Sequence, residues 1–76
     1  TVITPNPTEA QLLLGEPLQQ AAWDEAGAKA LAARVAERFA IDVVVTGVSL
    51  AHGSAGVAGC TGGAPWLVRH RRLAGH

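Results

Sequence analysis

Asn6 and Glu9 carry the side chains best placed to do chemistry in this chain. They stand three residues apart, just after a short β-rich run at residues 2–4, with Pro7 between them. Asn6 can cap a helix, Pro7 can take its first position, and Glu9 can reach back to the cap from the third. A helix N-terminus suits phosphate, and a carboxylate held there can recruit Mg²⁺. The same residues fit a capped turn that does no chemistry, so the spacing leaves both interpretations open.

Thr46 and Gly47 form a second candidate site, because they directly follow the β-branched run 43–45. We predict that this strand ends there, and ligands of open α/β sheets bind beyond the carboxyl ends of the strands. The threonine hydroxyl can donate to a phosphate oxygen, and the glycine lets the backbone approach a ligand closely. An ordinary passage from strand to loop would account for the same two residues.

The elements that would position these residues follow from the hydrophobic pattern. We predict a strand at 2–4, a helix at 7–14 closed by Gly15, a longer helix at 22–40 and a buried strand at 42–46. The two strands should be parallel and covered on both faces, as in an α/β protein. The buried face of the longer helix is expected to consist of Trp23, Ala26, Ala30, Leu31, Val35 and Phe39.

A β-hairpin is predicted for the second half of the chain. Residues 57–60 should pair antiparallel with residues 66–68 across a Gly-rich turn at 61–64. Trp66 is expected at an edge of the core. Alternation would then put Arg69 and Arg71 on one face of the second strand, with His70 and Arg72 on the other.

Composition and charge narrow the classes of function. The formal net charge is zero, which argues against nucleic-acid and membrane-surface partners. The single cysteine, Cys60, cannot form an internal disulfide, and no apolar run is long enough to span a bilayer. We therefore expect a cytoplasmic protein. A chain of 76 residues with 4% aromatic residues has few large side chains with which to build a core of its own. We therefore interpret residues 1–76 as a fragment of one larger α/β domain, and we expect the helices of the fragment to leave apolar faces exposed.

The motif T-P-N-x-x-E-A-x-x-L-x-G occupies residues 4–15, and it is followed by an amphipathic helix and then by Val43-Val44-Val45-Thr46-Gly47. With these features the chain resembles the C-terminal half of ribokinase-like small-molecule kinases. Within that superfamily the chain is most similar to the vitamin kinases that phosphorylate pyridoxal or hydroxymethylpyrimidine. The resemblance covers essentially the whole chain in order. It implies a three-layer αβα sheet and transfer of the γ-phosphoryl group of ATP to a hydroxymethyl group on a small heteroaromatic ring.

The resemblance also implies roles for individual residues. Glu9 would hold Mg²⁺ through water, Asn6 would orient that network, and Thr46 with Gly47 would contact the phosphates of ATP. Where this chain has Thr46-Gly47, pyridoxal kinases often carry Thr-Ser and pyrimidine kinases often carry Lys-Gly. Thr46-Gly47 therefore matches neither pattern. The resemblance makes pyridoxal the first choice of phosphoryl acceptor and hydroxymethylpyrimidine the second. It is also compatible with a homodimer.

The catalytic base of such kinases is expected beyond His76. Relatives in the superfamily carry a Gly-Thr-Gly-Asp or Gly-Thr-Gly-Cys anion-hole turn just after a strand that would end near Leu73, and the chain ends at Ala74-Gly75-His76. Residues 1–76 alone are therefore expected to be inactive. The contrasting hypothesis is a non-catalytic piece that acts only as a structural or interaction module.

Overall fold

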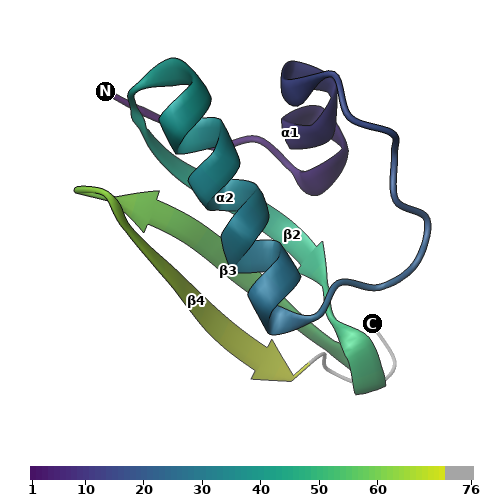
Figure 1. Ribbon diagram of the computed structural model, residues 1–76. Coiled ribbons are helices and arrows are strands. Elements are labelled where there is room, and N and C mark those ends of the chain that lie inside the picture. Colours follow the sequence, from purple (N-terminus) through teal and green to yellow (C-terminus); the bar gives the residue numbers. More distant parts are fainter. Residues whose placement is uncertain (72–76) are drawn as a thin grey trace.

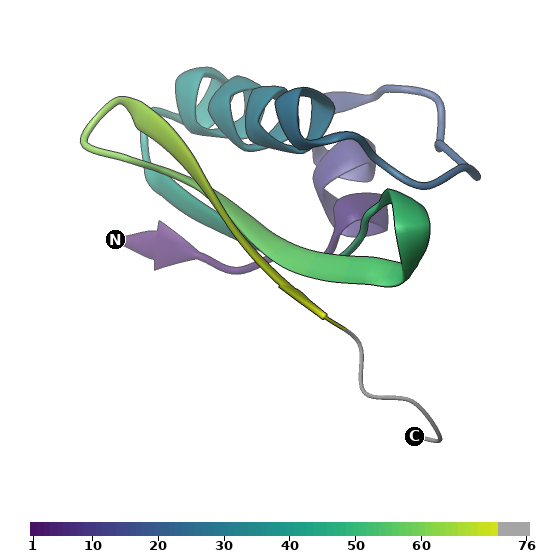
Figure 2. The same cartoon turned by 90° about the horizontal axis from the view of Figure 1, so that it is seen from below.

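The fold, described for residues 1–71 except the side chains of His52 and Arg71, is a four-stranded mixed sheet with two helices in a computed structural model. The elements in chain order are β1 (Val2–Ile3), α1 (Pro7–Leu14), α2 (Glu25–Phe39), β2 (Asp42–Ser49), the short 3₁₀ helix η1 (Ala51–Gly53), β3 (Ser54–Thr61) and β4 (Ala64–Arg71). The strand order is β1-β2-β3-β4. Both helices lie on one face of the sheet (Figures 1 and 2).

The predicted order of strand, helix, helix, strand and hairpin is confirmed. β1 and β2 are parallel, with Val2 beside Asp42 and Ile3 beside Val43. β2–β3 and β3–β4 are antiparallel. The turn between β3 and β4 consists of Gly62 and Gly63, whose φ angles are 58° and 81°. Both angles fall in the left-handed region that a two-residue hairpin turn of type I′ requires, which explains the Gly-Gly pair.

The longer helix starts three residues later than predicted. Asp24 is its N-cap, and the Asp24 carboxylate accepts a hydrogen bond from the backbone N–H of Gly27. Trp23 instead precedes the helix in an extended segment, where its N–H donates to the carbonyl of Ser49 at 2.9 Å. An aspartate at the N-cap accepts a hydrogen bond from a free N–H group of the first turn, which an alanine at position 22 cannot do. Outside the helix, Trp23 is buried against the end of β2.

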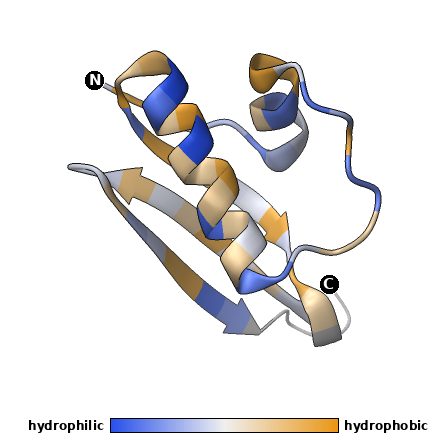
Figure 3. Ribbon diagram, in the orientation of Figure 1, coloured by the Kyte–Doolittle hydropathy of each residue, from blue (hydrophilic) through white to orange (hydrophobic). Residues whose placement is uncertain are grey.

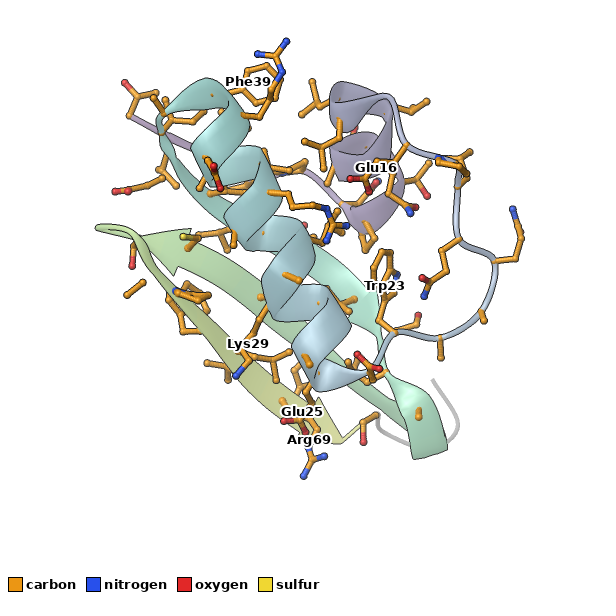
Figure 4. The ribbon with its side chains drawn as sticks, in the orientation of Figure 1. Glu16, Trp23, Glu25, Lys29, Phe39 and Arg69 are labelled. Carbon is orange, nitrogen blue, oxygen red and sulfur yellow. The ribbon has the colours of Figure 1, made fainter. Side chains whose placement is uncertain are left out.

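The buried face of α2 also differs from the predicted one. It consists of Ala28, Leu31, Ala32 and Val35. Ala26 and Ala30 are exposed, and Phe39 is 37% exposed at the far end of the helix, where the Arg38 guanidinium lies 5.1 Å from its ring centre (Figure 4). Leu31 and Val35 were predicted correctly. Ala26 and Ala30 follow Trp23 at helical spacing, but Trp23 is not part of the helix, and Phe39 keeps the phase of Val35 but is the last residue of the helix.

The core lies between α2 and the sheet. Val43 and Val45 of β2 are buried under the helix together with Ala58 and Cys60 of β3. Hydrophilic residues recur along α2 but gather at the carboxyl end of β4 (Figure 3). Cys60 is a free, buried cysteine, in line with its predicted lack of an internal disulfide partner.

The prediction that β2 is covered on both faces does not hold for the described part of the chain. Val44 points to the face without helices and is only half-buried, while Val2 and Val68 on the same face are 52% and 59% exposed. Leu12 and Leu13 of α1 are exposed as well. The fold class is thus α/β with one helical layer in residues 1–71. None of the helices in this range is long and apolar enough to cross a membrane.

Candidate functional site

Asn6 and Glu9 form the capping box that their spacing predicts. The Asn6 backbone N–H donates to Glu9 Oε1 at 2.9 Å, and the Glu9 backbone N–H donates to Asn6 Oδ1 at 2.8 Å. Both side chains remain exposed. Gly15 closes α1 in the left-handed conformation with φ 69°. The local sequence therefore fixes this short helix at both ends, and it holds the Glu9 carboxylate close to the backbone of Asn6.

The capping box leaves little of the helix N-terminus for an anion. The N–H groups of Asn6 and Glu9 are taken by the box, and Ala10 N–H donates to the Asn6 carbonyl at 2.9 Å. Pro7 has no N–H. Thr8 is the remaining residue of the first turn, and its N–H makes no hydrogen bond within residues 1–71. The helix thus offers a phosphate one backbone donor and its dipole, fewer groups than the sequence pattern suggests.

Thr46 and Gly47 lie beside the start of α1, although β2 does not end there. The Thr46 N–H donates to the Pro5 carbonyl at 2.9 Å, which joins β2 to the segment that follows β1. β2 continues to Ser49, so the predicted strand end at Thr46 is wrong. The pairing with β3 shifts between Val45 and Val48, and Gly47 has φ 68°.

This irregularity is a β-bulge, and it explains why the strand continues. Val45 and Val48 are both buried although they are three residues apart, which a regular strand with alternating faces does not allow. The extra residue turns Val48 back into the core and leaves the side chain of Thr46 and the backbone of Gly47 exposed. A Cβ added at Gly47 would meet no atom within 4 Å, so the space beside it is open.

A polar hollow of about 380 Å³ lies where these segments meet. Asn6, Thr8 and Gly47 line it together with the loop that leads into α2 and with Trp23. Trp23 is 8% exposed and lies between α1 and the first turn of α2 (Figure 4). The structure therefore brings Asn6 and Gly47 to one hollow, with Thr46 tied to the backbone that precedes Asn6.

Gln11 and Gln19 support the wall of this hollow, and both were missed in the sequence. The side chain of Gln11 is 5% exposed; its Nε2 donates to the Pro17 carbonyl at 3.0 Å, and its Oε1 accepts from the Gln19 N–H at 3.1 Å. These bonds hold the loop after α1 in place. The available signal was a glutamine among the leucines of a short helix, because a buried amide requires hydrogen-bond partners.

Glu9 lines a different hollow. This one has a volume of about 560 Å³ and is formed by Ile3, Pro5, Leu12 and Leu13 beside the Glu9 side chain. The two hollows flank the first turn of α1, and the bond to the Asn6 N–H holds the Glu9 carboxylate back on that turn. The structure does not place Glu9 in the polar hollow with Asn6 and Gly47.

The residues present fit Mg²⁺ and phosphate only in part. Among the side chains that the structure describes, no group of three or more His, Cys, Asp or Glu could hold a metal ion. Mg²⁺ in phosphate-binding sites often uses one or two carboxylates, with waters and phosphate oxygens completing the shell. One oxygen of Glu9 accepts from Asn6, and the other accepts no hydrogen bond from the described residues. Thr8 N–H, the Thr46 hydroxyl and the open backbone at Gly47 could contact phosphate.

The basic residues at the end of β4 are not part of this site. Arg69 makes an ion pair with Glu25 of α2, with Arg69 Nη1 at 2.7 Å from Glu25 Oε2 (Figure 4). Arg69 thus lies on the helix side of the sheet, and the alternation along β4 puts His70 on the opposite face, as predicted. The side chain of Arg71 lies outside the described part of the structure. The predicted positions of Arg72, of the strand end near Leu73 and of the approach to the anion-hole turn lie outside the described residues.

No protein-family model and no curated protein matches the chain. The kinase hypothesis consequently depends on the motif residues and on the geometry of the hollow formed by Asn6, Thr8, Gly47 and Trp23.

Proposed function

We propose that this chain is the part of a ribokinase-like kinase domain that binds the nucleotide and Mg²⁺. The whole enzyme would phosphorylate the hydroxymethyl group of a small heteroaromatic vitamin precursor. Pyridoxal is the first acceptor and hydroxymethylpyrimidine the second. ATP is the phosphoryl donor and Mg²⁺ the metal. The remainder of the acceptor site, the anion hole and the base belong to parts of such an enzyme that lie outside residues 1–71.

The observation that supports this proposal most is the hydrogen bond from Thr46 N–H to the Pro5 carbonyl. It joins two residues that are 41 positions apart in sequence, and it sets Thr46-Gly47 beside Asn6 just past the end of β1. The neighbouring strand β2 runs parallel to β1. Ligands of open α/β sheets bind at such carboxyl ends. Phosphoryl transfer needs positioned donors and charge neutralisation more than covalent chemistry from the protein, and this corner of the fold has positioned donors.

Each residue has a defined task in this proposal. The Thr46 hydroxyl and the Thr8 N–H donate to phosphate oxygens, and the bulge at Gly47 keeps the backbone open for their approach. Asn6 fixes the first turn of α1 and thereby the direction of the Glu9 side chain. Glu9 would hold the metal through a bound water on its second oxygen. A Mg²⁺ ion bound there would neutralise negative charge on the transferring phosphoryl group.

One observation favours a non-catalytic module instead. The capping box accounts for the positions of Asn6 and Glu9 without a ligand, and Glu9 faces a hollow that is otherwise apolar. Under that alternative the exposed leucines of α1 are a contact surface, and Glu9 has no role in binding a metal.

The direct experiment is an assay of the intact protein for Mg²⁺-dependent transfer from ATP to a panel of alcohols. We expect a phosphorylated hydroxymethyl product with pyridoxal or hydroxymethylpyrimidine, and no product when magnesium is removed with a chelator. Sugar alcohols and nucleosides serve as controls for acceptor class. Failure to phosphorylate any acceptor in the panel while the protein is folded would favour the non-catalytic module.

A further inference from the structure

One of the two segments that line most of the polar hollow is a loop with little support from its own backbone. The other segment is α1 with its N-cap, and the loop contributes residues 19–22. Within the described part of the chain, residues 17–22 make no backbone–backbone hydrogen bond. Holding such a loop in one conformation costs conformational entropy, which contacts with side chains must offset.

Gln11 of α1 supplies these contacts. It is the one buried polar residue in the described part of the chain, with 5% of its surface exposed. Its Nε2 donates to the Pro17 carbonyl at 3.0 Å, and its Oε1 accepts from the Gln19 N–H at 3.1 Å. Its backbone carbonyl accepts from the Glu16 N–H at 3.0 Å. Gln11 thus binds the loop to α1 at three of its residues.

Gln19 extends this support to the end of the loop. Its Nε2 donates to the carbonyls of Ala21 and Ala22 at 3.1 and 3.3 Å. Its backbone N–H is held by Gln11 at the same time. The Gln11 amide therefore fixes the loop through two direct bonds and through the side chain of Gln19. Both ends of that amide are required, because Pro17 needs a donor and the Gln19 N–H needs an acceptor.

We propose that Gln11 is a positioning residue of the nucleotide site, which holds residues 17–22 against α1 and so sets the affinity of the polar hollow for ATP. This inference rests on the proposed kinase function. Gln11 lines the hollow, but both ends of its amide are bonded to the loop, so it acts on the ligand through residues 19–22. A wall that is ordered before the ligand arrives spares binding the cost of ordering it.

A second contact at the same loop provides the matched control. Glu16 forms an ion pair with Arg34 of α2, with Arg34 Nε at 2.8 Å from Glu16 Oε2. These two side chains are 30% and 43% exposed respectively, so their pair adds little to stability. Neither residue lines the polar hollow. Arg34→Gln therefore releases the start of the loop while the bonds of Gln11 stay in place.

The test compares the intact wild-type protein with Gln11→Met and Arg34→Gln in ATP kinetics and amide hydrogen exchange. Methionine resembles glutamine in length and helix propensity and needs no hydrogen-bond partner, so α1 should stay folded. For Gln11→Met we expect KM for ATP to rise roughly 2- to 10-fold, with kcat within about twofold of wild type. The Gln19 amide should exchange at least about tenfold faster. Arg34→Gln should leave both KM and this exchange rate unchanged.

Gln19→Ala tests the same loop without any change in α1. It removes the bonds to the Ala21 and Ala22 carbonyls and should raise KM for ATP in the same direction. This variant decides the inference where circular dichroism shows that Gln11→Met does not fold.

Four results would overturn the inference while the kinase function stands. These are an unchanged KM in Gln11→Met, an unchanged exchange rate at Gln19, an equal rise of KM in Arg34→Gln, and a parallel loss of kcat and thermal stability. The last result would make Gln11 a purely structural residue. Absence of ATP turnover by the folded wild-type protein would instead contradict the kinase function itself, and the inference with it.

Discussion

The indole ring of Trp66 occupies the space directly above the α-carbon of Gly59. The two residues are paired across β3 and β4, and a methyl group added to Gly59 would collide with three ring atoms of Trp66. The indole N–H donates to Thr61 Oγ1 at 3.1 Å, which holds the ring along its own hairpin. Trp66 therefore covers the face without helices, and a glycine opposite it is a steric requirement.

Gly59→Ala should destabilise the protein by about 1–3 kcal/mol, because the ring must leave its position or the strand must shift. The measurement is chemical denaturation of wild type, Gly59→Ala, Trp66→Leu and the double variant. In the Trp66→Leu background the alanine should cost much less, since the colliding ring is absent. An equal cost in both backgrounds would mean that the contact with Trp66 is not the reason for the glycine.

The parts of the fold that could be predicted are those that depend on neighbours in sequence. The cap of α1 requires only residues 6–9, and the hairpin turn requires only Gly62-Gly63, so both were correct. Trp23 was misplaced because its partners, the Ser49 carbonyl and Leu50, are more than twenty residues away. The bulge at Thr46-Gly47 was missed for a similar reason, since it exists only relative to the register of β3.

Of the residues that line the polar hollow, Asn6 and Gly47 were named from the sequence, whereas Gln11 and Gln19 were missed. The sequence identified Asn6, Thr46 and Gly47, and the bond from Thr46 to the Pro5 carbonyl joins their segments. The sequence did not predict that Glu9 faces away from the polar hollow, because the orientation of α1 depends on how the helix packs against the rest of the fold. Trp66 was expected at the edge of the core, and it lies instead on the open face of the sheet above Gly59.

Asp24→Ala should lower the unfolding free energy by about 0.5–2 kcal/mol, because it removes the N-cap of the longest helix. Asp24→Asn keeps an accepting oxygen and should recover most of that loss. Glu25→Ala is the contrasting neighbour: its ion pair with Arg69 is exposed, so we expect a change of at most about 1 kcal/mol. Thermal unfolding of the three variants ranks them, and a larger loss for Glu25→Ala would contradict the assignment of Asp24 as the cap.

Thr46→Val should reduce kcat/KM for ATP by roughly 10- to 100-fold in the intact enzyme, because it removes a hydrogen bond to a charged phosphate worth about 1.5–3 kcal/mol. The backbone bond from residue 46 to Pro5 does not involve the side chain, so stability should change by no more than about 0.5 kcal/mol. Thr46→Ser retains the hydroxyl and should stay close to wild type. Equal activity of the valine and serine variants would show that the hydroxyl makes no contact with phosphate.

The role of Glu9 decides between a kinase site and a helix cap. Glu9→Gln retains a carbonyl oxygen that can accept from the Asn6 N–H, so the capping box survives while the charge is lost. Glu37→Gln is the matched control, an exposed glutamate on α2 away from the site. The measurement is kcat of the intact protein as a function of Mg²⁺ concentration, with the unfolding free energy measured on the same samples. We predict a roughly 10- to 100-fold lower kcat for Glu9→Gln with little loss of stability, as for a carboxylate that acts through a metal-bound water. Wild-type turnover of Glu9→Gln at saturating Mg²⁺ would contradict the account and leave Asn6 and Glu9 as a helix cap alone.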